Sequence, residues 1–599
     1  MTRVGTPLHG GLRARVVALA AAVLVSSAWA APQDALVTEG ERSGYVQTGR
    51  YAEVGTLCQA FAAAHPEAVR CQSFGTSPEG RPLWLLVASR SGALDPAAAQ
   101  ARGLPVVLVQ GGIHAGEIEG KDAGFLALRQ MLDGTAAKGA LDKAVLLFVP
   151  VFNADGHERF GAWNRPNQRG PQEMGRRSTA QNYNLNRDYM KLDAPEMRAM
   201  QGLLRRWDPI LVADLHTTDG AQFRPDVAVQ IEPLHAGDAG LAAQGRALST
   251  RLLGALRAQG AQPLPWYPTF RRRDDPSSGF AANVYEPRFS TGYFQLRNRF
   301  AVLVETHSWK DYPTRVRITR DFIVDLMADA AHHGATWRSV AHAADARSAR
   351  LAGQPLALDW KTTDRARTID FPGYAYVHAT SEVSGTEYIR YDEHVPQVWK
   401  VPLYETLVPA VTATVPAAGY LVPAAQADRV QPLLDLHGIA YRRIDHALAG
   451  QPVLAWRMSK AVFAAAPFEG RQRLQAEGGW RPERADLVAG ALFVPGDQPL
   501  ARLVVALLEP AAPDSLLAWG QFNAMFEAKE YMESYVAEDV AREQLRDPAL
   551  AAEFAAKLKD PAFAADPRAR LAFFIRRHPS WERELDLYPV YRLEQAPGT

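Results

Sequence analysis

Residues 105–117, PVVLVQGGIHAGE, join a strand-length apolar run to a turn that carries one histidine and one glutamate. The run 105–109 is rich in Val and Leu, which is typical of strands buried on both faces. Comparable runs at 145–149, 210–215 and 300–304 also end in polar residues, and longer segments with helical spacing lie between them. From about residue 45 to 335 this alternation predicts an α/β domain with a mixed, largely parallel sheet flanked by helices. Ligands bind beyond the carboxyl ends of such strands, so the polar clusters are candidates for one shared site.

The polar residues at these strand ends include a set suited to a metal ion. His114 and Glu117 are three residues apart, just before a helical segment at 121–132, so both side chains can face one point. With 15 histidines, roughly one H-x-x-E is expected by chance, and a surface turn is the other interpretation. His216 follows another buried-type strand at the same sheet end. Catalytic zinc takes three such ligands, and imidazole favours zinc over magnesium. The sequence therefore predicts one zinc ion on His114, Glu117 and His216.

Glu305 is the candidate catalytic base. It ends the apolar run 300–304, where burying a carboxylate is costly without a purpose or a partner. A carboxylate close to a metal-bound water can take its proton and deliver it onward. The other interpretation is an ion pair with Arg297 or Arg299.

Several motifs together resemble the carboxypeptidase A-like zinc carboxypeptidases over about residues 45–335. They are GTSPEGR at 75–81, HAGE at 114–117, NADG at 153–156, NLNR at 184–187, and then His216 and Glu305. The resemblance implies hydrolysis of a peptide bond next to a free carboxylate, with zinc polarising the carbonyl and Glu305 activating water.

The same resemblance implies roles for residues that bind substrate. Asn186 and Arg187 would hold the terminal carboxylate, which a guanidinium fork suits, whereas pairing of Arg187 with Asp188 is the other interpretation. Arg165 is the first choice for the oxyanion arginine, with Arg177 in reserve.

Two further positions of the resemblance are less direct. Tyr293 is preferred over Tyr285 as the family's mobile substrate-binding tyrosine. Asn184 stands where many members have Asp, which supports the first zinc-binding His through a hydrogen bond, and an amide could also accept such a bond.

The ends of the chain differ from this domain. Arg3, Arg13 and Arg15 precede an apolar stretch at 16–25 and the small-residue site AWA at 28–30, which predicts a signal peptide over residues 1–30. A membrane anchor is the alternative, but the stretch is shorter than the ~20 residues of a spanning helix. The catalytic domain is expected over 31–338. An accessory region, β-rich and then helical from about residue 515, is expected over 339–599.

If the protein is exported, its two cysteines could form a disulfide. Cys58 lies in a helical pattern at 51–64 and Cys71 opens the following extended segment, so an oxidising compartment would permit a disulfide between them. Two free thiols are the alternative. The protein is expected to be periplasmic or secreted, with no membrane span in the mature chain.

Composition narrows the choice of partners. The chain has 66 basic and 65 acidic residues, a formal net charge of +1, without the basic excess of a nucleic-acid binder. A peptide substrate is expected. A cell-wall peptide hydrolase with the same site and a non-catalytic peptide-binding protein are the alternatives.

Overall fold

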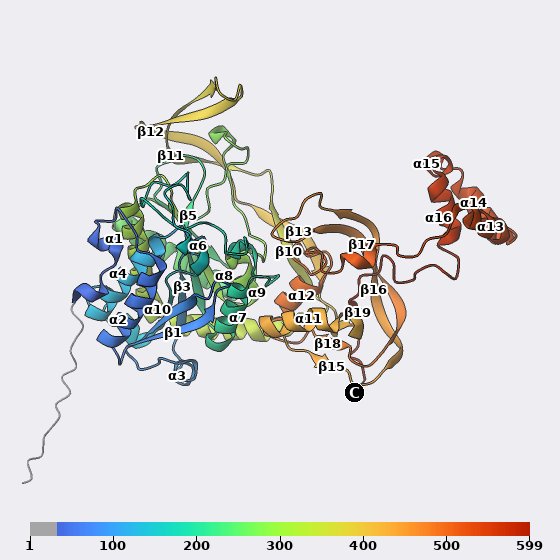
Figure 1. Ribbon diagram of the computed structural model, residues 1–599, viewed down its shortest axis with the longest axis horizontal. Helices are drawn as coiled ribbons and strands as arrows, with labels where there is room; N and C mark the ends of the chain where they lie inside the picture. The colour runs from blue at the N-terminus through green and yellow to red at the C-terminus, as the bar shows by residue number, and fades with distance from the viewer. Residues whose placement is uncertain (1–32, 599) are drawn as a thin grey trace, which may run out of the picture.

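The computed structural model describes residues 33–598, so the predicted signal peptide lies outside the described residues. Figure 1 shows an α/β domain formed by the first half of the described chain and a second, β-rich body formed by the later residues. Within the described range, no helix is both long enough and apolar enough to cross a bilayer.

An eight-stranded sheet forms the centre of the first domain, in the order β1-β2-β4-β3-β5-β9-β6-β7. Strands β4, β3, β5 and β9 are mutually parallel. Antiparallel pairs join β1 to β2, β2 to β4 and β9 to β6, and β7 pairs with β6 in parallel. This confirms the predicted mixed, largely parallel sheet. The strands are β1 Val69–Thr76, β2 Pro82–Ala88, β3 Val106–Gln110, β4 Val145–Val149, β5 Leu211–Thr218, β6 Val227–Glu232, β7 Pro263–Leu264 and β9 Phe300–His307.

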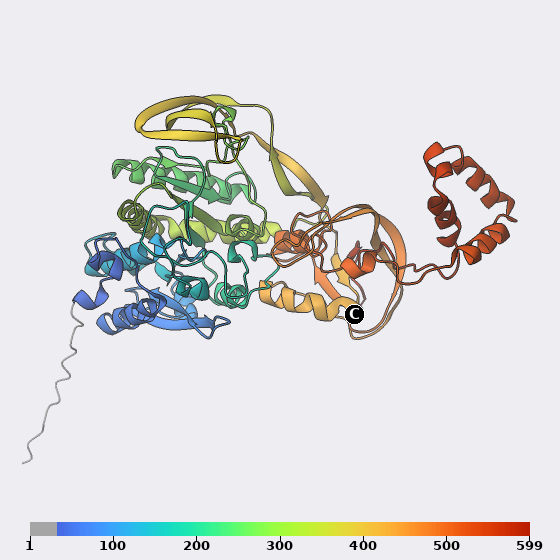
Figure 2. The ribbon, with the colours of Figure 1, turned by 45° about the horizontal axis from the view of Figure 1, so that its top comes forward.

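Helices cover the sheet on both faces (Figures 1 and 2). The helix α10 packs against α4, α5 and α8, while α2 packs on β1 and β2. The predicted disulfide is confirmed, because Cys58 of α2 is bonded to Cys71 of β1. The helices of this domain are α1 Glu39–Arg42, α2 Tyr51–Ala64, α3 Pro96–Ala101, α4 Glu119–Asp133, α5 Ala140–Lys143, α6 Ala154–Glu158, α7 Pro195–Trp207, α8 Ala239–Ala258, α9 Ser290–Leu296 and α10 Tyr312–Ser348.

Two central strands run further than the sequence predicts. The apolar runs end at residues 215 and 304, but β5 continues to Thr218 and β9 to His307. Thr217 and Thr306 suit a strand because they are β-branched, although they are not apolar. His216 and Glu305 therefore lie inside strands, and they are direct partners in the parallel register of β5 and β9.

Residue 338, the predicted end of the catalytic domain, falls within α10, and the strands of the later region begin after that helix. Strands β10 Pro355–Thr362 and β13 Leu407–Thr414 form an antiparallel pair. Between them in the chain, β11 Arg367–Thr380 and β12 Glu387–Tyr404 form a long hairpin that projects beside the first domain (Figure 1). Strand β12 also pairs with β8 Phe280–Ala281. A six-stranded sheet follows, in the order β15-β18-β14-β19-β16-β17. Its strands are β14 Gly419–Val422, β15 Arg442–Arg443, β16 Leu448–Phe463, β17 Leu474–Leu487, β18 Leu492–Pro495 and β19 Tyr591–Leu593, and its helices are α11 Ala424–His437 and α12 Ala501–Leu508.

The last helices lie apart from both bodies in Figures 1 and 2. They are α13 Ser534–Gln544, α14 Pro548–Lys557, α15 Pro561–Ala565 and α16 Pro567–Ile575, and they share a small apolar cluster around Phe573 and Phe574. This helical segment starts at Ser534, and the short strand β19 follows it.

Candidate active site

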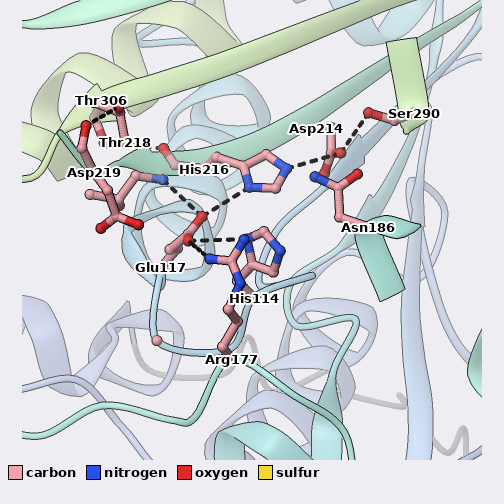
Figure 3. Close-up of polar contacts among 12 residues, drawn as sticks. His114, Glu117, Arg177, Asn186, Asp214, His216, Thr218, Asp219, Ser290 and Thr306 are labelled. Carbon is pink, nitrogen blue, oxygen red and sulfur yellow. Dashed lines mark hydrogen bonds and ion pairs between the residues drawn. The ribbon is translucent and has the colours of Figure 1, made fainter. Parts of the chain in front are cut away.

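Three predicted metal ligands converge at the carboxyl edge of the first sheet (Figure 3). His114 and Glu117 lie in the turn between β3 and α4, and His216 lies on the neighbouring strand β5. Their ligand atoms lie within 4.8 Å of one another. Glu117 Oε1 is 3.0 Å from His114 Nδ1, and Glu117 Oε2 is 2.9 Å from His216 Nδ1. Gly112 allows this turn, because its φ of 60° is in the left-handed region that favours glycine.

Each imidazole is oriented by a partner on its other nitrogen. His114 Nε2 lies 3.0 Å from Asn184 Oδ1, which is the contact predicted for Asn184. His216 Nε2 lies 3.0 Å from Asp214 Oδ2. Asp214 is itself held by hydrogen bonds from Gln110 Nε2 (2.9 Å) and Ser290 Oγ (2.7 Å). Both rings therefore present Nδ1 to the same point.

The donor set fits a zinc ion. Two imidazole nitrogens and one carboxylate, each supported from behind, are the usual ligands of catalytic zinc. Burial lowers the pKa of His114 to about 4, so its ring is neutral and can act as a ligand. Burial would also lower the pKa of His216, but Asp214 holds it well above the usual value, so metal binding at His216 is expected to release a proton.

Both candidate oxyanion arginines reach the ligand Glu117. Arg165 Nη2 lies 3.0 Å from Glu117 Oε1, and Arg177 Nη1 lies 3.3 Å from the same atom. Arg165 is buried and also bonds Asp219 at 3.1 Å, whereas the Arg177 side chain is 40% exposed. Arg177 is therefore the arginine that incoming molecules can reach.

Glu305 is buried beside the metal ligands. Its strand position opposite His216 puts the two side chains on the same face of the sheet. Burial raises the pKa of Glu305 to about 8, although His216 acts in the opposite direction. The arginines considered as partners bond elsewhere: Arg297 donates to the His437 carbonyl, and Arg299 donates to Asp208 and Asp345.

A cavity of about 250 Å³ opens next to Glu305. Asn186 and Arg187, the predicted carboxylate-binding pair, are among the residues that line it. Its lining residues are His114, Arg177, Asn186, Arg187, Tyr267, Thr269, Tyr285, Phe289, Ser290, Thr291, Leu303 and Glu305.

Arg187 supplies a cation without a fixed counter-ion to this cavity. Its guanidinium lies 4.1 Å from the centre of the Phe289 ring and donates to the Asn186 carbonyl at 2.7 Å. No carboxylate of the described chain lies within 4.0 Å of it, because Asp188 pairs with Lys191 at 2.6 Å instead. The Asn186 Oδ1 is buried and has no hydrogen-bond partner among residues 33–598. These polar groups are thus left available to a ligand.

The preferred substrate tyrosine, Tyr293, does not line the cavity. Its side chain is buried, and its hydroxyl donates to Gln201 Oε1 at 2.9 Å and lies 2.9 Å from His437 Nδ1. Tyr285, the second choice, and Tyr267 do line the cavity. The sequence distance to Glu305 did not separate Tyr285 from Tyr293, because both precede it at similar range.

Some of these residues were missed in the sequence. Asp214 could have been found, since residues two apart on a strand share a face and it stands two before His216. Ser290, Tyr267 and Thr269 come from loops and the short α9, and no local pattern marks them.

Comparison with known proteins agrees with this geometry. Residues 54–225 match the zinc carboxypeptidase family. The chain carries a zinc carboxypeptidase domain. Carboxypeptidase 2 of Trichophyton tonsurans is 24% identical over 469 residues, covering 74% of this chain and 78% of that relative. The zinc carboxypeptidase of Saccharothrix mutabilis subsp. capreolus is 28% identical over 148 residues, 23% of this chain and 33% of that relative. Among solved structures, carboxypeptidase A of Helicoverpa armigera aligns with a TM-score of 0.34 at 15% identity, covering 50% of this chain and 75% of that chain.

The zinc carboxypeptidase domain and the carboxypeptidase relatives support a metallocarboxypeptidase, a zinc-dependent hydrolase, in agreement with the resemblance seen in the sequence. Its cofactor is one zinc ion, and the described residues contain the matching His-Glu-His group. The matches favour neither the cell-wall hydrolase nor the non-catalytic binding protein.

Proposed function

We propose that this zinc carboxypeptidase removes the last residue of peptides that end in a free carboxylate, with the site residues acting as follows. The main support is that one cavity is lined by Glu305, by the metal ligand His114 and by Arg187, a cation that forms no ion pair within the described residues. A peptide anchored by its terminal carboxylate at Arg187 would present its last peptide bond to the side of the cavity where His114 and Glu305 lie.

Each residue then has a distinct task. His114, Glu117 and His216 would hold the zinc ion, which would supply a Lewis acid to polarise the scissile carbonyl and acidify water. Glu305 accepts a proton from the attacking water and delivers it to the amine nitrogen that leaves. This assignment uses the position of the Glu305 carboxylate beside the ligands.

Other residues of the cavity bind the substrate and stabilise the negative charge that develops on the carbonyl oxygen. Arg187 holds the terminal carboxylate through paired hydrogen bonds, and Asn186 adds an amide to the same group. We assign the developing oxyanion to Arg177 in preference to Arg165, because Arg177 lines the cavity and Arg165 is already engaged by Asp219. Tyr285, in preference to Tyr293, is the tyrosine that contacts substrate.

The cavity wall also supports a preference for the released residue. Tyr285, Phe289 and Leu303 supply apolar surface, and the Ser290 hydroxyl is turned to Asp214. Apart from Glu305, the charged side chains that line the cavity are cations. Peptides that end in an apolar or aromatic residue should therefore be cleaved faster than those that end in Lys or Arg.

We further propose that the protein is exported. The N-terminal sequence has the signal-peptide pattern, and disulfides such as that between Cys58 and Cys71 persist in oxidising compartments. Mass spectrometry of the protein recovered from a bacterial periplasm or medium should find an N-terminus close to Ala31.

One experiment tests the function directly. The purified protein is incubated with a peptide library in free-acid and C-terminally amidated forms, with and without a zinc chelator, and the products are read by mass spectrometry. Loss of single residues from free-acid peptides alone, abolished by the chelator and restored by zinc, is the expected result. Equal cleavage of the amidated set, or internal cleavage, would contradict the proposal.

A further inference from the structure

A turn of the accessory region reaches the carboxylate-binding segment of the catalytic domain. Residues 468–471, which we call the accessory tip, lie between β16 and β17 and contact the chain some 285 residues earlier. Phe468 and Arg471 exchange two backbone hydrogen bonds, of 2.9 and 3.1 Å, across Glu469 and Gly470. Both central residues have positive φ, 49° and 77°, which is the conformation of a tight type I′ turn. The tip is therefore a defined turn, and Glu469 stands at its apex.

The accessory tip is held against the catalytic domain on both sides of Glu469. Arg471 Nε donates to Asp193 Oδ2 at 3.0 Å, and a second guanidinium nitrogen contacts the other oxygen of the same carboxylate. Gly470 lies so close to Tyr183 that an added Cβ would sit 3.1 Å from the ring. These contacts fix the place of Glu469, whose Oε2 accepts a hydrogen bond from the Asn184 backbone N–H at 3.1 Å.

Asn184 connects this turn to both halves of the site. Its Oδ1 lies 3.0 Å from the zinc ligand His114 and accepts the backbone N–H of Asn186, also at 3.0 Å. It thereby caps the short 3-10 turn Leu185–Arg187, which carries the carboxylate-binding pair. A single residue, Asn184, thus links Glu469 both to the zinc ligand His114 and to the carboxylate-binding turn.

Glu469 also places a negative charge near a group of cations. Burial lowers the pKa of Arg187, and the neighbouring Arg177 and Arg288 lower it further, while Glu469 acts in the opposite direction. Nearby like charges disfavour the charged form of Arg187, and a nearby carboxylate favours it. The accessory carboxylate therefore acts on both the backbone and the charge of the anchor.

We propose that Glu469 is a positioning residue for the Asn184–Arg187 segment, so that the accessory region completes the carboxylate-binding wall of the catalytic domain. This inference rests on the proposed carboxypeptidase function. Glu469 bonds the backbone amide of Asn184 and does not line the cavity. The accessory region would therefore affect substrate binding and not the chemical step.

The test uses the full-length zinc enzyme and the variants Glu469→Ala, Glu469→Gln and Glu477→Gln. Glu477 lies in β17 of the same region, its side chain is 69% exposed, and it pairs only with Lys460 in the part of the chain that the structure describes, so it is a matched control. We expect Glu469→Ala to raise KM for a free-acid peptide about tenfold with kcat kept within about twofold, because an ionic hydrogen bond to the anchor is lost. Glu469→Gln keeps an acceptor oxygen and should raise KM less. Glu477→Gln should match the wild type.

A second readout separates binding from turnover. On a Glu305→Gln background, calorimetry measures the dissociation constant of the same peptide, which should weaken by the factor seen in KM, while zinc content stays at one per chain. A KM unchanged in both Glu469 variants, in folded protein that cleaves the peptide, would overturn the inference and leave the function standing. Failure of the wild type to cleave any free-acid peptide would instead overturn the function.

Discussion

The two walls of the cavity are built in different ways. We call His114, Glu117, His216 and Glu305 the metal wall, of which His114 and Glu305 line the cavity. We call residues 184–187 the anchor wall, of which Asn186 and Arg187 line it. The metal wall stands on paired strands and the turn after β3, and each of its four side chains is at least nine-tenths buried. The anchor wall is a single 3-10 turn, with Arg187 half-buried and Asn184 bonded to the accessory tip. Sites on strands are held more rigidly than sites on loops, so the difference indicates fixed chemistry opposite adjustable recognition.

The largest effect is expected when the metal wall loses its base. Glu305→Gln keeps the shape of the side chain but cannot take a proton, so kcat should fall by roughly 10²- to 10⁴-fold. KM and the zinc content should change little, because neither the anchor nor the ligands are altered. Steady-state kinetics on a free-acid peptide, with metal analysis of the same sample, measure both. A turnover within tenfold of the wild type would show that Glu305 is not the base.

A change in the anchor wall should mainly raise KM for the substrate. Removing the guanidinium with Arg187→Ala leaves the substrate carboxylate without its cation, and we expect KM to rise roughly 10²-fold. Arg187→Lys should recover only part of this, since an ammonium cannot form the paired hydrogen bonds. The amidated peptide provides the control: the wild type should discriminate against it, and Arg187→Ala should not. Retained discrimination in Arg187→Ala would assign the carboxylate to another group.

The metal wall could be predicted from the sequence because its position follows from topology. Apolar runs mark the parallel strands, and parallel strands bring the residues at their carboxyl ends to one edge, where His114 and His216 meet. The apolar criterion failed only at the strand ends. It stopped before the polar residues of β5 and β9, so it missed that His216 and Glu305 are register partners.

The anchor wall could be predicted only in part. Asn186 and Arg187 were found through a motif, but the contact of Asn184 with Glu469 joins two regions that no local pattern connects. The sequence could not decide between Tyr293 and Tyr285 for a related reason. The side chain that reaches the cavity depends on the packing of α9 against the accessory region, where His437 engages the Tyr293 hydroxyl.

Asn184 belongs to both walls, which allows a sharper test of their independence. Asn184→Ala should weaken zinc binding about 10- to 100-fold, because His114 loses the acceptor that orients it. The same variant should also raise KM, since the cap of the anchor turn is removed. Asp214→Asn should weaken zinc binding through His216 without changing KM. Chelator competition measures the zinc affinity, and the kinetics are repeated at saturating zinc. Identical behaviour of the two variants would contradict the separation of the walls.

Two buried carboxylates near the site differ as well. Asp214, next to the zinc ligand His216, accepts hydrogen bonds on both oxygens. Both oxygens of Glu196, in the first turn of α7, lack a hydrogen-bond partner among the residues described, and Glu196 feels the charge of Asp188, which follows the anchor wall. Burial raises the pKa of Glu196 to about 7 from 4.5, and Asp155 and Asp188 add to the shift.

This asymmetry predicts a pH-dependent cost in stability. Because the folded protein keeps the Glu196 proton to a higher pH than the unfolded chain does, the free energy of unfolding should fall as the pH rises from about 4.5 to about 7. Glu196→Gln removes this loss and should stabilise the protein by about 1 to 3 kcal/mol at high pH. Denaturant unfolding between mildly acidic and mildly alkaline pH measures the difference, with Glu477→Gln as the exposed control. A gain that does not grow with pH would mean that Glu196 is paired in solution, as Asp214 is in the structure.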